Sequence, residues 1–223
     1  MSKVTRISVV GALAFWFVGV AVATEQPKYE VLEQYGNVEL RRYQPMLIAE
    51  TWVDGSMSNA SGRGFRILAD FIFGNNTAAA GHSQEIAMTS PVTMQPQAEE
   101  IAMTAPVTMQ QESGRWRVHF VMPSAYTYET LPQPNNPQVK VRQVPAIDYA
   151  VVSFSGFAGD KRTAQIAEAL LAWMLENGLT PLANPEVARY DPPWRLPFMR
   201  RNEVMIAFER ERQPEAEALA QIP

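Results

Sequence analysis

The chain of 223 residues has no cysteine and only two histidines, His82 and His119. Without cysteine there is no disulfide bond, thiolate nucleophile, cysteine-ligated zinc or iron–sulfur cluster. Two histidines are too few for a histidine-rich metal site. No serine–histidine–aspartate set, metal-binding motif or paired acid motif is visible in the sequence. We therefore expect a binding protein rather than an enzyme.

An excess of basic residues is also missing. The chain has 19 Lys and Arg against 23 Asp and Glu, a formal net charge of −4 and a pI near 5.3. Proteins that bind nucleic acid usually carry a basic face, so no nucleic-acid partner is expected. No glycine-rich phosphate loop follows a predicted strand, which disfavours a dinucleotide-binding fold. A hydrophobic content of 47% is typical of a globular protein.

The N-terminal residues 1–23 are predicted to be a secretory signal peptide. Lys3 and Arg6 precede an apolar run from Ile7 to Val22, and the small residues Ala21 and Ala23 suit a signal peptidase. The run has 16 residues, fewer than the roughly 20 that span a bilayer. An uncleaved anchor is the alternative. Cleavage would remove two cations, change the net charge from −4 to −6 and leave no stable membrane span.

The first part of the remaining chain predicts three strands followed by a helix. The predicted strands are 29–34, 37–43 and 46–53, and the predicted helix is 58–73. Tyr35-Gly36 is typical of a hairpin turn between the first two strands. Ser58 or Asn59 is expected to cap the helix, and Gly74 is expected to end it.

An eleven-residue motif occurs twice. Residues 85–95 (EIAMTSPVTMQ) and 100–110 (EIAMTAPVTMQ) are identical at ten of eleven positions. Two copies are too few for a solenoid, which needs at least three repeats, so we interpret them as a local duplication. The second copy runs directly into the predicted strand 115–122. We therefore expect the second copy to hold the position in the fold and the first to form a longer loop or an edge hairpin.

The second part of the chain repeats the order of elements. The predicted strands are 115–122, 138–143, 147–155 and 200–208, with a helix over 161–177 that Asp160 caps. The proline-rich segments 123–137 and 190–198 are predicted to be loops. Strands, one helix and further strands in each half predict a single α+β domain over 24–208, with antiparallel pairing and a pseudo-two-fold repeat. A polar tail is expected over 209–223.

Several segments resemble the SOUL family of haem-binding proteins. They are Tyr29–Leu32 with Val38–Tyr43, Gly64–Ile72, Ile101–Val107, Phe120–Ser124, Ala188–Trp194 and Arg200–Val204. Together they extend over about residues 28–208, and the Met-Thr-Ala/Ser-Pro-Val segment is the most diagnostic. The resemblance implies a distorted antiparallel β-barrel flanked by two helices, similar to the GyrI-like effector-binding fold. It also implies haem or a related porphyrin as the ligand.

The resemblance places the haem slot against the first helix. The candidate residues on this helix are Arg63, Phe65, Arg66, Leu68, Phe71 and Ile72. A haem site needs an apolar slot and cations for the two propionates. The two arginines are three residues apart, so they are neighbours on a helix and can pair with propionates. In the alternative interpretation the apolar residues are core and the arginines are solvated.

His82 and Met103 are the candidates for an axial ligand. His82 lies in the polar segment 77–84 after the helix, and Met103 lies in the second copy of the motif. A histidine in a loop is more often simply exposed, and a methionine in an apolar segment is more often core. His119 shares one face of its predicted strand with Arg115 and Arg117 and is expected to be an exposed cross-strand partner. No position matches the histidine ligand of the family, so axial ligation stays open.

The expected function is stoichiometric haem binding, as a carrier or buffer in the periplasm or outside the cell. It depends on the family resemblance and the predicted signal peptide. The alternative is a non-haem module on the same fold that binds a small molecule or presents the methionine-rich motif to a protein partner.

Overall fold

The computed structural model describes residues 24–96 and 115–210. The predicted signal peptide, the second copy of the motif with Met103, and residues 211–223 of the tail lie outside the described residues. The elements in chain order are β1 Tyr29–Tyr35, β2 Val38–Tyr43, β3 Met46–Asp54, α1 Met57–Ile72, β4 Asn76–Thr77, β5 Val92–Pro96, β6 Arg115–Val121, β7 Gln133–Pro134, β8 Lys140–Val144, β9 Ile147–Ser155, α2 Asp160–Glu176, β10 Leu179–Pro181, β11 Glu186–Arg189, the 3₁₀ helix η1 Pro197–Met199 and β12 Arg201–Arg210.

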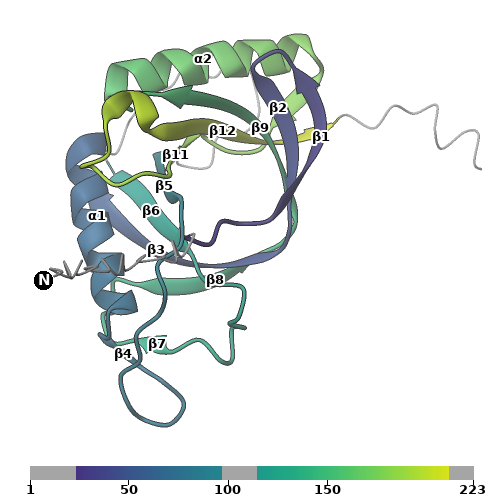
Figure 1. Ribbon diagram of the computed structural model, residues 1–223. Helices are drawn as coiled ribbons and strands as arrows, with labels where there is room; N and C mark the ends of the chain where they lie inside the picture. The colour runs from purple at the N-terminus through teal and green to yellow at the C-terminus, as the bar shows by residue number, and fades with distance from the viewer. Residues whose placement is uncertain (1–23, 97–114, 211–223) are drawn as a thin grey trace, which may run out of the picture.

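One curled antiparallel sheet dominates the structure (Figure 1). Its strand order is β1-β2-β9-β12-β11-β5-β6-β3-β8, and β10 pairs with β12 beside this path. The halves β3-α1-β5-β6 and β9-α2-β11-β12 have the same internal pairing, and they join where β5 pairs with β11. The predicted pseudo-two-fold α+β architecture is therefore confirmed.

Both helices pack on the same, outer face of the sheet. Residues of β5 and β6 such as Met94 and Val118 form a core under α1, and Ala150 and Ile206 belong to a second core under α2. Because side chains alternate along a strand, the next residues form a third core on the concave face, which includes Tyr149. The sheet is thus buried on both faces over much of its area.

This double burial corrects one expectation about β6. His119 is only 7% exposed, whereas the sequence predicts an exposed partner. The alternating pattern of β6 correctly separates two faces. It fails to show that the polar face is enclosed, because the enclosure comes from the curl of the sheet rather than from β6 itself.

Helix α1 begins with a side-chain cap and packs closely on the sheet. Ser56, rather than Ser58 or Asn59, is the N-cap, and its hydroxyl accepts from the Asn59 N–H at 3.5 Å. At Gly64 an added Cβ would lie 2.6 Å from Val118 Cγ2. Glycine is therefore required there for the helix to approach β6.

The first copy of the motif, not the second, supplies β5. Its residues Val92–Pro96 pair with β11 on one side and with β6 on the other. The Ile86 N–H donates to the Ile72 carbonyl at 2.8 Å, and Asn76 Nδ2 donates to Gln84 O at 2.7 Å. These contacts fix the first copy directly after α1. The prediction that the second copy holds this position is therefore wrong for this structure.

The last strand is longer than the sequence predicts. β12 continues to Arg210, which pairs with Leu179 of β10, so Glu209 and Arg210 belong to the sheet and not to the tail. Within the two described ranges, no helix has the length and apolar character needed to cross a bilayer.

Candidate functional site

The six residues predicted on α1 divide into two groups. Leu68, Phe71 and Ile72 have no exposed surface and belong to the core beneath the helix. They were expected to line an open slot, but in this structure their periodic spacing marks the buried side of the helix. Arg63, Phe65 and Arg66 are exposed, and Phe65 packs against Phe120 with ring centroids 5.5 Å apart.

A cluster of exposed apolar side chains lies on residues 190–200, which we call the aromatic loop. Its exposed members are Trp194 at 83%, Leu196 at 56%, Phe198 at 72% and Met199 at 49%. Phe157, 64% exposed, is in the neighbouring turn, which is joined to the loop by a bond of 2.9 Å from Gly156 N to Pro197 O. Large exposed apolar patches usually mark binding sites.

Arg189 connects the aromatic loop region to α1. Its Nη1 donates to Ser61 Oγ on α1 at 3.1 Å, and its Nη2 donates to Ala158 O at 2.7 Å. The Thr163 hydroxyl on the first turn of α2 donates to Met57 Sδ on the first turn of α1 at 3.9 Å. The first turns of both helices therefore meet beside the aromatic loop (Figure 1). We call this surface the helix-corner face.

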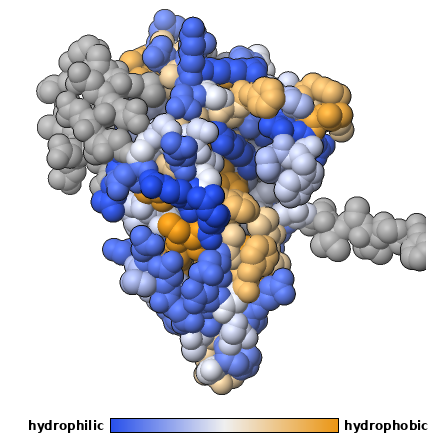
Figure 2. Space-filling view, turned by 90° about the vertical axis from the view of Figure 1, so that its left-hand side faces the viewer, coloured by the Kyte–Doolittle hydropathy of each residue, from blue (hydrophilic) through white to orange (hydrophobic). Residues whose placement is uncertain are grey.

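The helix-corner face is rich in cations although the chain is acidic overall. The cations on or beside its elements are Arg63, Arg66, Lys161, Arg162, Arg195 and Arg200, against Asp54, Asp160, Glu168 and Asp191. Asp191 is already paired with Arg195 at 2.7 Å. The N-terminal ends of two helices add partial positive charge. Figure 2 shows this side of the molecule, where orange patches lie among blue side chains. The face suits an apolar ligand with negative groups.

Buried Glu203 holds both ends of the aromatic loop. It is fully buried and accepts hydrogen bonds from Tyr190 Oη at 2.7 Å and Arg201 Nη2 at 2.7 Å. On its other side Arg41 Nη1 lies 3.1 Å from both carboxylate oxygens. Burial alone would raise the pKa of Glu203, but Arg41, Tyr190 and Arg201 together lower it below the ordinary value. Glu203 is therefore a charged anchor for the loop.

A second group of ionic residues fills the concave face. Arg117 Nη2 lies 3.0 Å from Glu186 Oε1, and Tyr149 Oη donates to the same oxygen at 3.3 Å. Burial raises the pKa of Glu186 despite Arg117. Burial, with Arg117 and Arg142, lowers the pKa of His119 to about 3. These groups lie inside the curl of the sheet, where Arg117 Nε and His119 Nδ1 have no hydrogen-bond partner among the described residues. They do not open onto the helix-corner face.

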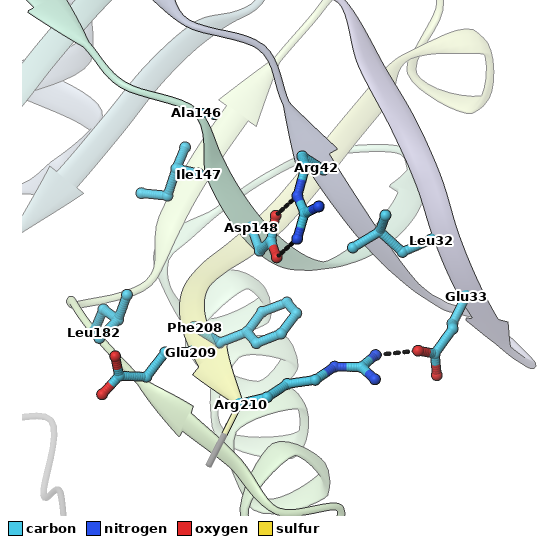
Figure 3. A pocket seen from close by; sticks show the side chains of 10 residues that line it. All are labelled: Leu32, Glu33, Arg42, Ala146, Ile147, Asp148, Leu182, Phe208, Glu209 and Arg210. Carbon is cyan, nitrogen blue, oxygen red and sulfur yellow. Dashed lines mark hydrogen bonds and ion pairs between the residues drawn. The ribbon is translucent and has the colours of Figure 1, made fainter. Parts of the chain in front are cut away.

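A separate cavity lies on the α2 side of the sheet (Figure 3). It has a volume of about 710 Å³, and five of its ten lining residues are apolar. Arg42 donates to Asp148 through two bonds of 2.8 Å, and Arg210 pairs with Glu33. Together with Glu209 the charged groups of the lining sum to −1. This cavity is therefore unfavourable for a ligand with two carboxylates.

His82 does not lie at the helix-corner face. It is exposed in a turn closed by a bond of 2.9 Å from Ala78 N to His82 O, beyond the C-terminal end of α1. The helix rises about 16 Å between Ser61 and Ile72, at 1.5 Å per residue. Within the described ranges, no group of three or more His, Cys, Asp or Glu is placed to hold a metal ion.

Sequence reasoning missed the aromatic loop. It classed residues 190–198 as loop because of their prolines and assigned no role to Trp194 and Phe198. One signal was available: large aromatic side chains alternate there with prolines and arginines, although a solvated loop ordinarily contains small polar residues.

Comparison with known families decides the identity of the fold. Residues 24–207 match the family described as SOUL heme-binding protein. The chain belongs to this family. No curated protein matches the chain. The family membership agrees with the sequence resemblance over nearly all of the described residues.

Solved structures similar to this SOUL protein share its fold at low sequence identity. The crystal structure of the EcmrR C-terminal domain has 13% identity and a TM-score of 0.54, covering 82% of this chain and 99% of that one. A hydrolase from Listeria innocua has 10% identity and a TM-score of 0.51, covering 78% and 92%. The curled half-barrel with two helices is thus the GyrI-like effector-binding fold that the sequence predicts. These likenesses concern the fold alone.

Proposed function

We propose that this protein binds haem or a related tetrapyrrole at the helix-corner face, as a stoichiometric carrier or buffer. The observation that carries the proposal is the aromatic loop, which exposes Trp194 and Phe198 beside a concentration of arginines. Membership of the SOUL family supports haem as the ligand. The helix-corner face matches both chemical features of haem. It has an apolar surface for the porphyrin face and cations for the negatively charged propionates.

The proposed binding follows from burial and charge. A porphyrin face laid on Trp194 and Phe198 removes apolar surface from water, worth about 2 kcal/mol for each large side chain that becomes covered. Arg66 makes no ion pair with any described residue and is free to meet a propionate. Arg63 already donates to the Asp54 carbonyl, so it is positioned as the second partner.

The proposal includes no catalytic step. Bound haem would supply an iron centre, but a carrier or buffer requires only binding and release. His82 lies away from the helix-corner face and is not assigned as an axial ligand. The predicted signal peptide supports a location in the periplasm or outside the cell.

A titration of the purified chain with ferric haem, followed by the Soret band, tests the proposal. We expect a saturable one-to-one shift. Arg66→Ala should raise the Kd about tenfold, because it removes a contact worth about 1.4 kcal/mol. Trp194→Ala should raise it about thirtyfold, because about 2 kcal/mol of apolar burial is lost. Phe73→Ala is the matched control, since Phe73 is an exposed aromatic residue at the other end of α1. His82→Ala should leave the band position unchanged.

The absence of a saturable shift would overturn the proposal. Equal losses in Trp194→Ala and Phe73→Ala would show that haem binds without using the helix-corner face. Loss of the shifted band in His82→Ala would place the iron at the other end of α1.

The cavity in Figure 3 favours a second candidate, a binding module for a non-haem ligand. Its mixture of apolar lining residues and a net negative charge suits an uncharged or cationic amphiphile. Binding of a fluorescent lipophilic cation that Leu182→Ala weakens, with no haem shift, would support this candidate over the first.

A further inference from the structure

The duplicated motif is not explained by ligand binding. The first copy has a demanding environment in the sheet, where Met94 is fully buried and Thr89 donates to the Val121 carbonyl. Gln95 Nε2 donates to Asn184 O at 2.6 Å. Each of these side chains is needed for the fit of β5 between its neighbours.

The second copy carries the same side chains in the same order. The positions equivalent to Thr89, Met94 and Gln95 are again threonine, methionine and glutamine, and the copies differ only at Ser90 and Ala105. In the structure Ser90 bonds through its backbone N–H, to Glu25 O at 2.9 Å. Alanine has the same N–H. Nothing in the contacts of β5 therefore discriminates against the second copy.

The pairing register also suits the second copy. β5 now places Met94 opposite Val118 and ends at Pro96 opposite Trp116, where proline supplies no N–H to extend the ladder. In the same register the second copy would place Met109 opposite Val118 and Glu112 opposite Arg115. Ser113-Gly114 then remains as a two-residue connection, the length and composition that favour a tight β-hairpin.

We propose that the two copies are alternative occupants of the β5 position and that the sheet exchanges one for the other. The exchange presents the same side chains at the first four positions of β5, replaces Pro96 by Gln111, and moves 15 residues from the connection after β5 to the connection before it. Loop-closure entropy changes slowly with loop length, so neither arrangement is strongly favoured by it. The second arrangement lengthens the segment that carries His82. The proposal is independent of haem binding.

Disulfide formation in the otherwise cysteine-free chain tests the exchange. Thr93 of β5 lies opposite Ala188 of β11, and Thr108 is the equivalent residue of the second copy. Two variants, Thr93→Cys/Ala188→Cys and Thr108→Cys/Ala188→Cys, are equilibrated with glutathione disulfide, which is reduced to two glutathione molecules as the two protein thiols are oxidised to a disulfide. Ser113→Cys/Ala188→Cys is the control, because the exchanged register would place residue 113 in the connection to β6 and not opposite residue 188.

We expect the effective concentrations of the two thiols in the two test pairs to agree within about tenfold. Such a ratio corresponds to a free-energy difference of about 1.4 kcal/mol between the two arrangements. The control pair should be at least about a hundredfold lower. If the 108–188 pair forms no more readily than the control while the 93–188 pair forms, the two copies do not exchange.

Proline substitutions provide a second test that needs no cysteine. β5 is an interior strand, so its N–H groups are used in the ladder and proline at Thr93 excludes the first copy. Under exchange, Thr93→Pro should retain cooperative unfolding because the second copy takes the position. The double variant Thr93→Pro/Thr108→Pro should lose it. Equal collapse of the single and double variants would refute the proposal.

Discussion

Replacement of Glu203 tests whether one buried carboxylate stabilises the sheet and the aromatic loop together. Glu203→Ala removes the main partner of Arg41, which is only 2% exposed. Breaking a buried ion pair from one side costs about 3–5 kcal/mol. Arg41 keeps Glu39 at 2.8 Å, but that carboxylate is 30% exposed, and Tyr190 and Ser153 lose their acceptor. We therefore expect a loss of about 4 kcal/mol in the free energy of unfolding.

Urea unfolding at pH 7, followed by circular dichroism, measures this loss. Asp148→Ala is the control, because it breaks the surface pair with Arg42, whose side chain is 55% exposed, and should cost less than about 1 kcal/mol. Adding Arg41→Met to Glu203→Ala should recover part of the loss, since no buried charge then lacks a partner. A loss below about 1 kcal/mol for Glu203→Ala would refute the assigned role.

Two further substitutions test the packing of β6. Burial, with Arg117 and Arg142, lowers the pKa of His119 to about 3. Below about pH 6.5, the ordinary pKa of histidine, His119 therefore takes up a proton in the unfolded chain but not in the folded chain. Stability should fall as pH drops from about 6.5 toward 3, by up to about 1.4 kcal/mol per unit. His119→Gln should lose about 2 kcal/mol less than wild type between pH 7 and 5 in urea unfolding; equal losses would contradict this. Gly64→Ala should cost about 2 kcal/mol because its Cβ meets Val118, whereas Gly62→Ala, with no such contact, should stabilise the chain by about 0.5–1 kcal/mol; thermal unfolding of both variants checks the contrast.

The elements of the fold that sequence predicts well have local causes. The hairpin between β1 and β2 turns at Gly36, which has a φ of 61°, where glycine is favoured. Helix α1 shows its buried side through the spacing of Leu68 and Ile72, and its bounds differ by one residue from those predicted. In both cases the deciding interactions lie within a few residues of one another.

The choice between the two copies of the motif has no local cause. The copies are nearly identical, so propensity and pattern are the same for both. The contacts that seat the first copy come from outside it, through Asn76 and Ile72 at the end of α1. The sequence prediction instead depended on the second copy running directly into β6. That argument concerns the connection to β6 and not the contacts with the end of α1.

The site was only partly predictable for a related reason. Helical spacing identifies the apolar residues that face the core, and these are the residues that a ligand cannot reach. Phe65 is the apolar residue of the predicted set that stays partly exposed, at 36%. Exposed apolar residues such as Trp194 lie in an irregular loop, where no period separates core from surface.

The pseudo-two-fold fold explains why the helix-corner face exists at all. Each half places a helix directly after a strand, after β3 and after β9, and the halves join at β5 and β11. The first turns of the two helices therefore meet, and their partial positive charges add at one place. The symmetry is broken by the connection that follows each joining strand. After β11 this connection is the aromatic loop, and after β5 it begins the segment that contains the second copy of the motif. Because the ends of the aromatic loop are bound to Glu203, a change that frees Glu203 should disturb ligand binding and stability together, whereas a change in the occupant of β5 should leave the loop in place.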